Sequence, residues 1–345
     1  MKLLITGGAG FLGYHLATYF NNKCEKLTLL DIAQFPEIEY KGFNLVTCDI
    51  RDRKKLSAAI KGHTHVIHAA AALPLWSRED IFSTNIQGTK NVLDASRKYI
   101  IKRVVYISST AVYGVPKKHP VFETDPMVGV GPYGISKIAS EQHCRQAIEK
   151  GLNVTIIRPK TFVGTGRLGV FEILFDWIHD GKKIPVVGSG NNRYQLLEVD
   201  DLVAAIAKSL ESRSKRLNDA FNVGAERFQT VRKDLEDVFS YAKSGSTIFP
   251  TPAWPIKKTL WILEQLNLSP LYQWVYETAD KDSFVSIEKM KKATGWQPKH
   301  SNAEALIKAY RWYLDHYKEV KSRKSGITHT AGWKQGALGI VKRFM

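Results

Sequence analysis

The first half of the chain alternates short apolar runs with stretches of helical spacing, and this rhythm constrains the fold more than any other feature. The apolar runs cover residues 2–6, 27–31, 44–48, 65–69, 103–108 and 153–158. The helical stretches between them cover residues 10–21, 52–60, 83–99 and 133–150. Strands that alternate with helices form βαβ units, in which helices cover both faces of a parallel sheet. The sequence therefore predicts an α/β fold with a doubly wound parallel sheet.

A glycine-rich segment joins the first apolar run to the first helical stretch. It reads Thr6-Gly7-Gly8-Ala9-Gly10-Phe11-Leu12-Gly13, and Asp31 follows 18 residues after Gly13 at the end of the second run. Glycines let the backbone approach a pyrophosphate closely, and the free N–H groups of a helix N-terminus attract it. Asp31 is placed to accept hydrogen bonds from ribose hydroxyls, and its charge repels a 2′-phosphate. The segment predicts a dinucleotide site that prefers NAD over NADP.

A second group of residues suggests chemistry at that site. Tyr133 and Lys137 stand four residues apart in a helical stretch, so their side chains lie on one face. An ammonium beside a phenol, together with an oxidised nicotinamide, would lower the pKa of the tyrosine and make it a general base. Ser109, just past a strand end, is placed to hydrogen-bond the same substrate oxygen. We expect Ser109, Tyr133 and Lys137 to form the catalytic group.

The order of these motifs resembles the extended short-chain dehydrogenase/reductases, in particular the NAD-dependent epimerase/dehydratase family. The resemblance covers residues 1–310 and rests on Thr6 to Gly13, Asp31, Asp49-Ile50, His68-Ala69-Ala70-Ala71, Asn85, Ser108 to Gly114, Tyr133 to Lys137 and Arg158-Pro159. It implies a Rossmann doubly wound parallel sheet with a smaller C-terminal α/β substrate lobe. It also implies reversible hydride transfer at a secondary alcohol or ketone, with NAD as cofactor, and a homodimer formed through residues 83–99 and 133–150.

The resemblance further assigns roles to single residues. It implies that Asp49 and Ile50 flank the adenine and that Lys137 also holds the nicotinamide ribose. Tyr133 is the acid/base and Ser109 the supporting hydroxyl. The full set of cofactor residues that we expect is Gly7, Gly10, Phe11, Leu12, Gly13, Asp31, Asp49, Ile50, Ala69, Ala70, Ala71, Asn85, Ser108, Tyr133, Lys137 and Pro159.

Two branches of the family stay open for the substrate. Nucleotide-sugar epimerases oxidise the sugar, turn the ketone and return the hydride to the other face; segments 109–114, 132–137 and 295–298 resemble them. The branch of 3β-hydroxysteroid dehydrogenases and dihydroflavonol reductases takes a hydrophobic alcohol or ketone, and shares Arg158-Pro159 and Asn192-Arg193. We favour the epimerase and keep the dehydrogenase or reductase as the alternative. A non-catalytic dinucleotide-binding protein is the second alternative.

Three residues are expected to contact the substrate. Thr110 and Ala111 stand where sugar 4,6-dehydratases carry Asp-Glu, so dehydration is not expected. Thr161 replaces an Asn that usually contacts the substrate, and Arg193 would pair with a diphosphate. In the hydrophobic branch the pocket would instead be lined by Trp254, Ile256, Leu260, Trp261, Ile262, Leu263, Leu271, Tyr272 and Trp274.

The regular alternation ends near Pro159, where glycines begin to separate short elements. We expect a NAD-binding Rossmann domain over residues 1–160 and a substrate-binding lobe over residues 161–320, interleaved with late strands of the sheet. Residues 321–345 form a basic, aromatic tail, for which we expect either peripheral contact with an anionic membrane or packing on the protein itself or on a partner subunit.

Composition excludes several classes of function. The formal net charge is +17, and residues 281–345 hold 14 Lys and Arg against 5 Asp and Glu, or +9 of it. We attribute the excess to solubility and expect no nucleic-acid partner. The three cysteines lack metal-ligand spacing, and His65 and His68 point to opposite faces of a strand, so no metal is expected. The chain has neither a membrane-spanning run nor a signal-peptide pattern, which predicts a cytoplasmic protein.

Overall fold

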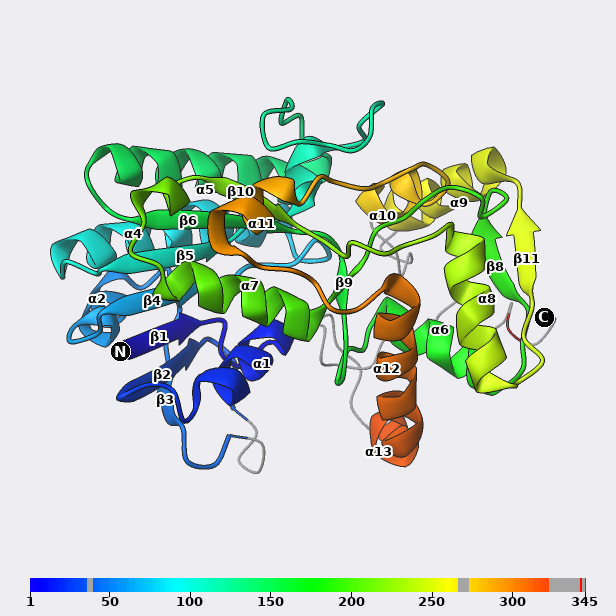
Figure 1. Cartoon of the computed structure of the whole chain (residues 1–345), viewed down its shortest axis with the longest axis horizontal. Coiled ribbons are helices and arrows are strands. Elements are labelled where there is room, and N and C mark those ends of the chain that lie inside the picture. Colours follow the sequence, from blue (N-terminus) through cyan, green and yellow to red (C-terminus); the bar gives the residue numbers. More distant parts are fainter. Residues whose placement is uncertain (36–39, 266–272, 323–341, 343–344) are drawn as a thin grey trace.

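A seven-stranded parallel sheet forms the larger half of the molecule (Figure 1). The computed structural model describes residues 1–35, 40–265, 273–322, 342 and 345. The strand order is β10-β6-β5-β4-β1-β2-β3. The strands are β1 (Lys2–Thr6), β2 (Lys26–Asp31), β3 (Asn44–Thr47), β4 (His65–His68), β5 (Arg103–Ile107), β6 (Val154–Pro159) and β10 (Ala220–Val223). The doubly wound α/β architecture predicted from the sequence is confirmed.

Helices cover both faces of this sheet because neighbouring strand residues point to opposite sides. Leu3 and Ile5 of β1 belong to one buried cluster, whereas Leu4 between them belongs to another. The first face is covered by α1 (Phe11–Phe20), α7 (Val199–Glu211) and α11 (Glu288–Thr294). The second is covered by α2 (Arg53–Ile60), α4 (Thr89–Lys98) and α5 (Gly131–Glu149).

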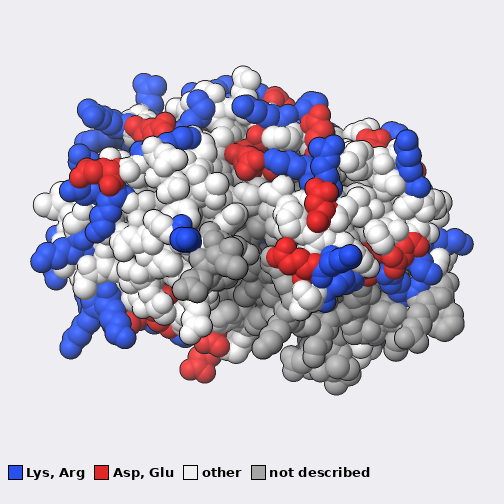
Figure 2. All heavy atoms as spheres, turned by 90° about the horizontal axis from the view of Figure 1, so that it is seen from below, with Lys and Arg blue, Asp and Glu red and all other residues white. Residues whose placement is uncertain are grey.

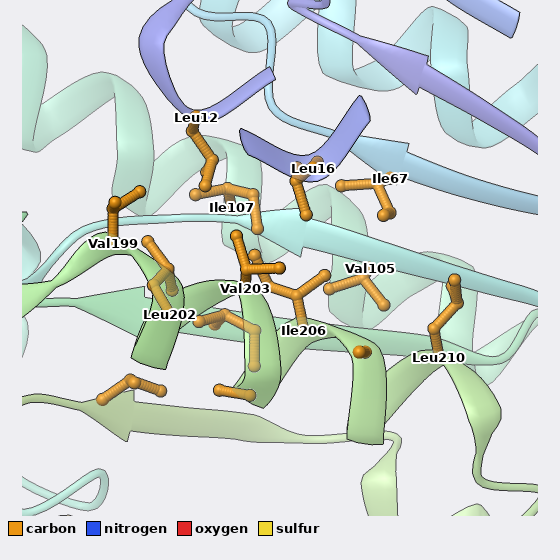
Figure 3. Close-up of a cluster of buried hydrophobic side chains, with 14 of the residues drawn as sticks. Leu12, Leu16, Ile67, Val105, Ile107, Val199, Leu202, Val203, Ile206 and Leu210 are labelled. Atoms are coloured by element: carbon orange, nitrogen blue, oxygen red, sulfur yellow. The ribbon is translucent and has the colours of Figure 1, made fainter. Parts of the chain in front are cut away.

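The first of these clusters shows how α7 is attached to the sheet. Figure 3 shows Val203 and Ile206 of α7 facing Val105 and Ile107 of β5, with Leu16 of α1 beside them. These side chains are almost fully buried. Burial of one such side chain stabilises the fold by about 1.5–3 kcal/mol. A helix from the middle of the chain is thereby held firmly on the N-terminal sheet.

The helix expected over residues 83–99 is part of a longer helical run. It begins with α3 (Arg78–Phe82), continues as a π-helix (Ser83–Gly88) and ends as α4. The Ser77 hydroxyl accepts a hydrogen bond from the Asp80 N–H and so caps α3. A Cβ on Gly88 would lie 2.5 Å from Cδ1 of Ile50, so this run packs tightly against the segment that follows β3.

The smaller half contains two short parallel strand pairs and several helices. The pairs join β7 (Phe162–Val163) to β9 (Leu197–Glu198) and β8 (Ile184–Val187) to β11 (Ile248–Thr251). The helices are α6 (Val170–His179), α8 (Val231–Ala242), α9 (Ala253–Gln265), α10 (Gln273–Thr278), α12 (Asn302–Asp315) and α13 (Tyr317–Ser322). Two 3-10 helices, Thr110–Tyr113 and Lys215–Leu217, belong to the sheet half.

The two halves interleave along the chain. After β9 the chain returns to the sheet through α7 and β10, and Met290 and Trp296 also join the core beneath the sheet. The Trp296 Nε1–H donates to the Asp201 carbonyl O at 2.9 Å, and the N–H groups of Lys299 and His300 donate to the Asp201 carboxylate. The Gly-Trp-Gln-Pro segment therefore fastens the second half to α7.

Of the C-terminal tail, residues 321–322, 342 and 345 are described, and the first two belong to α13. Nζ of Lys342 lies 2.6 Å from the Asp176 carboxylate and 2.7 Å from that of Asp180, and Met345 packs against the core of the smaller half. The rest of the segment that is expected to contact a membrane lies outside the described residues. Among the described residues, no helix is long and apolar enough to cross a bilayer.

Positive charge is also present at the far end of the sheet half. Figure 2 shows Lys and Arg gathered toward its left-hand end, the end at which Figure 1 places α2 and α4. A surface depression between these two helices is lined by Arg53, Lys54, Lys61, Arg97 and Lys98. The basic excess is therefore not confined to the C-terminal region.

Candidate active site

The glycine loop lies at the C-terminal ends of the strands and is closely packed. The N–H groups of Gly7 and Gly8 donate to the Leu30 carbonyl O at 2.8 and 3.1 Å. Gly7 has a φ of +76°, and a Cβ there would lie 2.7 Å from the Ala70 nitrogen. A Cβ on Gly13 would collide with the Gly7 carbonyl O and lie 2.7 Å from Cα of Gly8. Positions 7 and 13 therefore accept only glycine in this geometry.

The loop leads into an uncapped helix N-terminus. Gly10 is the N-cap of α1 and provides no side-chain hydrogen bond to its first turn. The first-turn N–H groups and the positive end of the helix dipole are thus available to an anion. A bare backbone next to such a terminus fits the pyrophosphate of a dinucleotide.

Asp31 stands at the end of β2 beside this loop. Its Oδ2 accepts the Ala9 N–H at 3.0 Å and its Oδ1 accepts the Ala33 N–H at 3.0 Å. Asp31 therefore fastens the loop to β2. A carboxylate has about four lone-pair sites, so it retains capacity for ribose hydroxyls.

The end of β4 is positioned by buried polar contacts. The Ala69 N–H donates to the Thr6 carbonyl O at 3.1 Å, and the Ala70 N–H donates to the Thr6 hydroxyl at 3.3 Å. The His68 ring contacts the Thr6 and Thr89 hydroxyls at 2.8 and 3.0 Å. Because burial lowers the pKa of His68 to about 3, this ring is neutral. These contacts set residues 69–71 beside the glycine loop.

Two other expected cofactor residues have partners within the protein. The Asp49 carboxylate accepts from Nε and Nη2 of Arg51 at 2.9 and 2.7 Å; burial raises its pKa, but these hydrogen bonds outweigh burial and lower it. The Asn85 side chain accepts the Ala72 N–H at 2.8 Å and donates to the Ser136 hydroxyl at 3.0 Å. Asn85 thus links the segment after β4 to α5.

The structure brings Ser109, Tyr133 and Lys137 together. Ser109 follows β5, where its hydroxyl accepts the Ala111 N–H at 3.1 Å and hydrogen-bonds the Tyr133 side chain. Nζ of Lys137 lies 5.7 Å from the centroid of the Tyr133 ring and donates to the Ile107 carbonyl O at 2.9 Å. All three lie at the edge of the sheet that also carries the glycine loop.

The expected lowering of the tyrosine pKa, which included the charge of an oxidised nicotinamide, stays a prediction; within the protein, Lys137 is not among the groups that lower it. Burial raises the pKa of Tyr133 to about 12, and the Ser109 hydrogen bond and the charge of Arg167 lower it by less. Burial also lowers the pKa of Lys137 to about 8. Burial is the largest cause of both shifts, and Nζ of Lys137 donates to the Ile107 carbonyl O rather than to the phenol.

A buried ion pair supports this group from behind. Nη2 of Arg158 lies 2.6 Å from Oε2 of Glu141, and both side chains have no exposed surface. Arg158 also donates to the Tyr113 hydroxyl, and the Ser108 hydroxyl donates to Glu141, both at 2.6 Å. Ser108, an expected cofactor residue, therefore directs its hydroxyl into this network, which joins β5, β6 and α5.

The expected substrate residues lie in different surroundings. The Thr110 hydroxyl donates to the Pro159 carbonyl O at 3.3 Å, and the Thr161 side chain hydrogen-bonds Tyr194. The Arg193 guanidinium lies against the adjoining rings of Phe228 and Phe284, at 4.8 and 4.7 Å from their centroids. Thr110 and Thr161 therefore flank Pro159 at the end of β6, while Arg193 is exposed on the surface of the smaller half.

The apolar stretch considered as a pocket lining is divided. Trp254 and Trp261 are 72% and 49% exposed, whereas Leu260 and Trp274 are buried. Leu271 and Tyr272 lie outside the described residues. Trp254 and Trp261 face outward, so the continuous apolar lining expected for a hydrophobic substrate is not formed by the whole stretch.

One cluster of possible metal ligands occurs in the described part of the chain. It joins Glu198, Asp201 and His300. Lys308 pairs with Glu198 at 3.0 Å, and the His300 ring contacts Asp201 at 3.0 Å. These contacts give each group a protein partner and hold α7 to the C-terminal segments.

Sequence reasoning missed two buried cations near this edge. The guanidinium carbon of Arg167 lies 5.1 Å from the Phe11 centroid and 5.3 Å from that of Phe162, and its charge acts on Tyr133. Lys160, the residue after Pro159, donates to the Ser283 hydroxyl at 2.7 Å. A charged residue directly after a buried strand was the available signal for Lys160.

Comparison with known proteins finds a family, related sequences and solved structures that match this chain. The profile of the NAD dependent epimerase/dehydratase family matches residues 3–224. The uncharacterized protein y4nG of Sinorhizobium fredii is 34% identical over 340 residues, 98% of this chain and 85% of that protein. The UDP-glucose 4-epimerase of Halalkalibacterium halodurans is 25% identical, over 92% of this chain and 96% of that protein. The UDP-glucuronic acid 4-epimerase of Bacillus cereus, solved in complex with NAD, has a TM-score of 0.76 at 20% identity, and the match covers 92% of this chain and 100% of that one. This structural likeness shows the shared fold.

Proposed function

We propose that this chain, which belongs to the NAD-dependent epimerase/dehydratase family, is a nucleotide-sugar epimerase. The observation that carries the proposal is the assembly of Ser109, Tyr133 and Lys137 at the strand ends that also hold the glycine loop. The relatives named as UDP-glucose 4-epimerases support a nucleotide sugar as the substrate.

NAD is the cofactor that the residues at this edge fit. The glycine loop and the α1 N-terminus would receive the pyrophosphate, and Asp31 would receive the ribose hydroxyls. By the family resemblance, Asp49 and Ile50 would flank the adenine. Residues 69–71 and Pro159 line the path toward Tyr133. When bound, NAD supplies the acceptor and donor of the hydride.

Tyr133 and Ser109 act on the substrate hydroxyl. The Ser109 hydroxyl positions the substrate oxygen, and Tyr133 takes its proton during oxidation and returns it during reduction. With a pKa of about 12, Tyr133 rests as the neutral phenol at neutral pH. The positive charges of Arg167 and of the oxidised nicotinamide favour the phenolate when proton transfer is required. Lys137, fixed by the Ile107 carbonyl O, holds the nicotinamide ribose.

Dehydration does not fit this site. Thr110 and Ala111 occupy the positions of the Asp-Glu pair expected in a sugar dehydratase, and neither side chain titrates in the range that elimination of water needs. The Thr110 hydroxyl is engaged by the Pro159 carbonyl O. The site retains an acid/base for one hydroxyl only.

Proton NMR of nucleotide sugars incubated with the purified protein tests the proposal. We expect UDP-glucose, UDP-galactose or a related sugar to give its epimer without net consumption of NAD, and Tyr133→Phe to give none. Net formation of NADH with a hydrophobic alcohol, and no sugar epimer, would reject the epimerase in favour of the dehydrogenase alternative.

We also propose a homodimer. Its contact would be formed by the π-helix with α4 and by α5 of each protomer. This contact rests on the family resemblance of residues 83–99 and 133–150. Gel filtration with light scattering checks it: the expected mass is twice the 38.9 kDa of one chain. A monomeric mass at all concentrations would reject it.

A further inference from the structure

Lys160 stands at the junction of the two halves, directly beside the catalytic edge. Its backbone N–H donates to the Val223 carbonyl O at 2.9 Å, which holds it at the ends of β6 and β10. The residue before it, Pro159, accepts the hydrogen bond of Thr110, the neighbour of Ser109. The Lys160 side chain is 2% exposed. A buried cation thus lies one residue away from a proposed cofactor contact.

The hydrogen-bond and ring partners of the Lys160 ammonium come from the smaller half, and its charge also acts on His119. Nζ donates to the Ser283 hydroxyl at 2.7 Å and lies 4.9 Å from the Tyr194 ring centroid and 5.7 Å from that of Trp274. An ammonium has three donors, and within the described part of the chain this one makes a single hydrogen bond and no salt bridge. A buried charge without a counter-ion is costly.

A second donor next to Lys160 is also unsatisfied. Trp274 is buried, and its Nε1–H has no hydrogen-bond partner among the described residues. Buried polar groups in folded proteins are almost always hydrogen-bonded, so two unfilled donors beside one another indicate an acceptor supplied from outside the chain. Burial lowers the pKa of Lys160 to about 7, and a bound anion would restore its full charge.

The position of Lys160 indicates which part of the substrate it would contact, the sugar or the diphosphate. Tyr194 and Ser283 face each other across a β-bridge, and both contact or adjoin Lys160. Their chain neighbours, Arg193 and Phe284, contact each other instead, because adjacent residues of an extended segment point to opposite sides. The ammonium of Lys160 therefore lies on the side of this bridge opposite Arg193. Along the chain, Lys160 stands between Pro159 and Thr161, which the proposed function places at the cofactor and at the sugar.

We propose that Lys160 recognises a carboxylate on the sugar of the substrate, with Trp274 as a second donor. The chain would then act on a nucleotide-linked hexuronate in preference to a neutral hexose. This inference rests on the proposed function and names the substrate class of the same site. Lys160 is a specificity-determining residue in this account, and Ser283 positions its ammonium.

Calorimetric titration of the NAD-loaded protein with UDP-glucuronate, UDP-glucose and UDP tests the inference. A hydrogen-bonded ion pair in a buried site predicts that UDP-glucuronate binds about tenfold to a hundredfold more tightly than UDP-glucose. Lys160→Met should remove this preference and leave UDP and UDP-glucose binding unchanged. Lys160→Gln gives a second variant if the first is unstable, and Lys118→Met, on an exposed lysine, is the matched control.

The outcomes separate the two proposals. Equal binding of the two sugars by the unaltered protein, or a preference that survives in Lys160→Met, overturns the role of Lys160 while UDP-glucose binding still supports the epimerase. Binding of neither UDP sugar nor UDP overturns the proposed function and this inference together. Retained UDP affinity in the Lys160 variants shows that they are folded.

Discussion

The buried pair of Arg158 and Glu141 gives the sharpest stability prediction. Both side chains are fully buried, and their closest atoms lie 2.6 Å apart. Glu141→Gln leaves the guanidinium buried without a counter-ion, and breaking a buried pair in this way destabilises by about 3–5 kcal/mol. Unfolding entropy of about 2.1 cal/mol/K per residue gives about 0.7 kcal/mol/K for 345 residues. The melting temperature should therefore fall by about 4–7 °C.

Differential scanning calorimetry measures this shift. Asp94→Asn is the control, because the Lys90–Asp94 pair at 3.0 Å is partly exposed and of the i,i+4 type, which contributes about 0.3–0.5 kcal/mol. Combining Glu141→Gln with Arg158→Met should recover part of the loss, since the uncompensated charge is then removed. A Glu141→Gln protein that melts within about 1 °C of the unaltered protein would refute the reasoning.

Three further predictions concern the site. Tyr133→Phe should reduce kcat by a factor of about 100 to 10,000 while NAD content is unchanged, since only the acid/base is lost; normal turnover would exclude the assigned role. Gly13→Ala should lower the NAD retained after purification, because its Cβ collides with the Gly7 carbonyl O; unchanged NAD in the heat-denatured extract would argue against the loop as the pyrophosphate site. Lys160 has a folded pKa of about 7 and an ordinary value of 10.5. Between these pH values the unfolded chain binds the extra proton, so stability rises with pH, by at most about 1.4 kcal/mol per unit. Urea titrations at pH 7.5 and 9.5 measure the free energy of unfolding, and Lys160→Met should reduce its rise between these two pH values. An unchanged rise would contradict the burial of a neutral amine at position 160.

Much of the sheet half was predictable from local pattern. Strands such as residues 103–107 are apolar on both faces, and glycines and helical periodicity bound them, so a parallel sheet was the expected result. Strand β10 was missed because its four residues, Ala220–Val223, form a run too short to stand out as a strand, although Asn218-Asp219 and Gly224 bound it. Its position beside β6 depends on contacts distant in sequence.

The geometry of the catalytic group was predicted better than its electrostatics. The i,i+4 spacing of Tyr133 and Lys137 places both side chains on one face of α5, and Ser109 reaches them from the end of β5. The direction of the Tyr133 pKa was not predictable, since it depends on how deeply the phenol is buried and on which carbonyl receives the lysine. Likewise, the significance of Lys160 appears only when Ser283 and Trp274 are seen beside it.

Epimerisation in D2O without added NAD tests the central claim most directly. We expect the sugar epimer to form with protium on its inverted carbon, because the hydride removed from that carbon is held at the site and returned to it. Deuterium at the inverted carbon, or absence of any epimer across UDP-linked neutral and acidic sugars, would contradict a hydride-transfer epimerase built on Ser109, Tyr133 and Lys137.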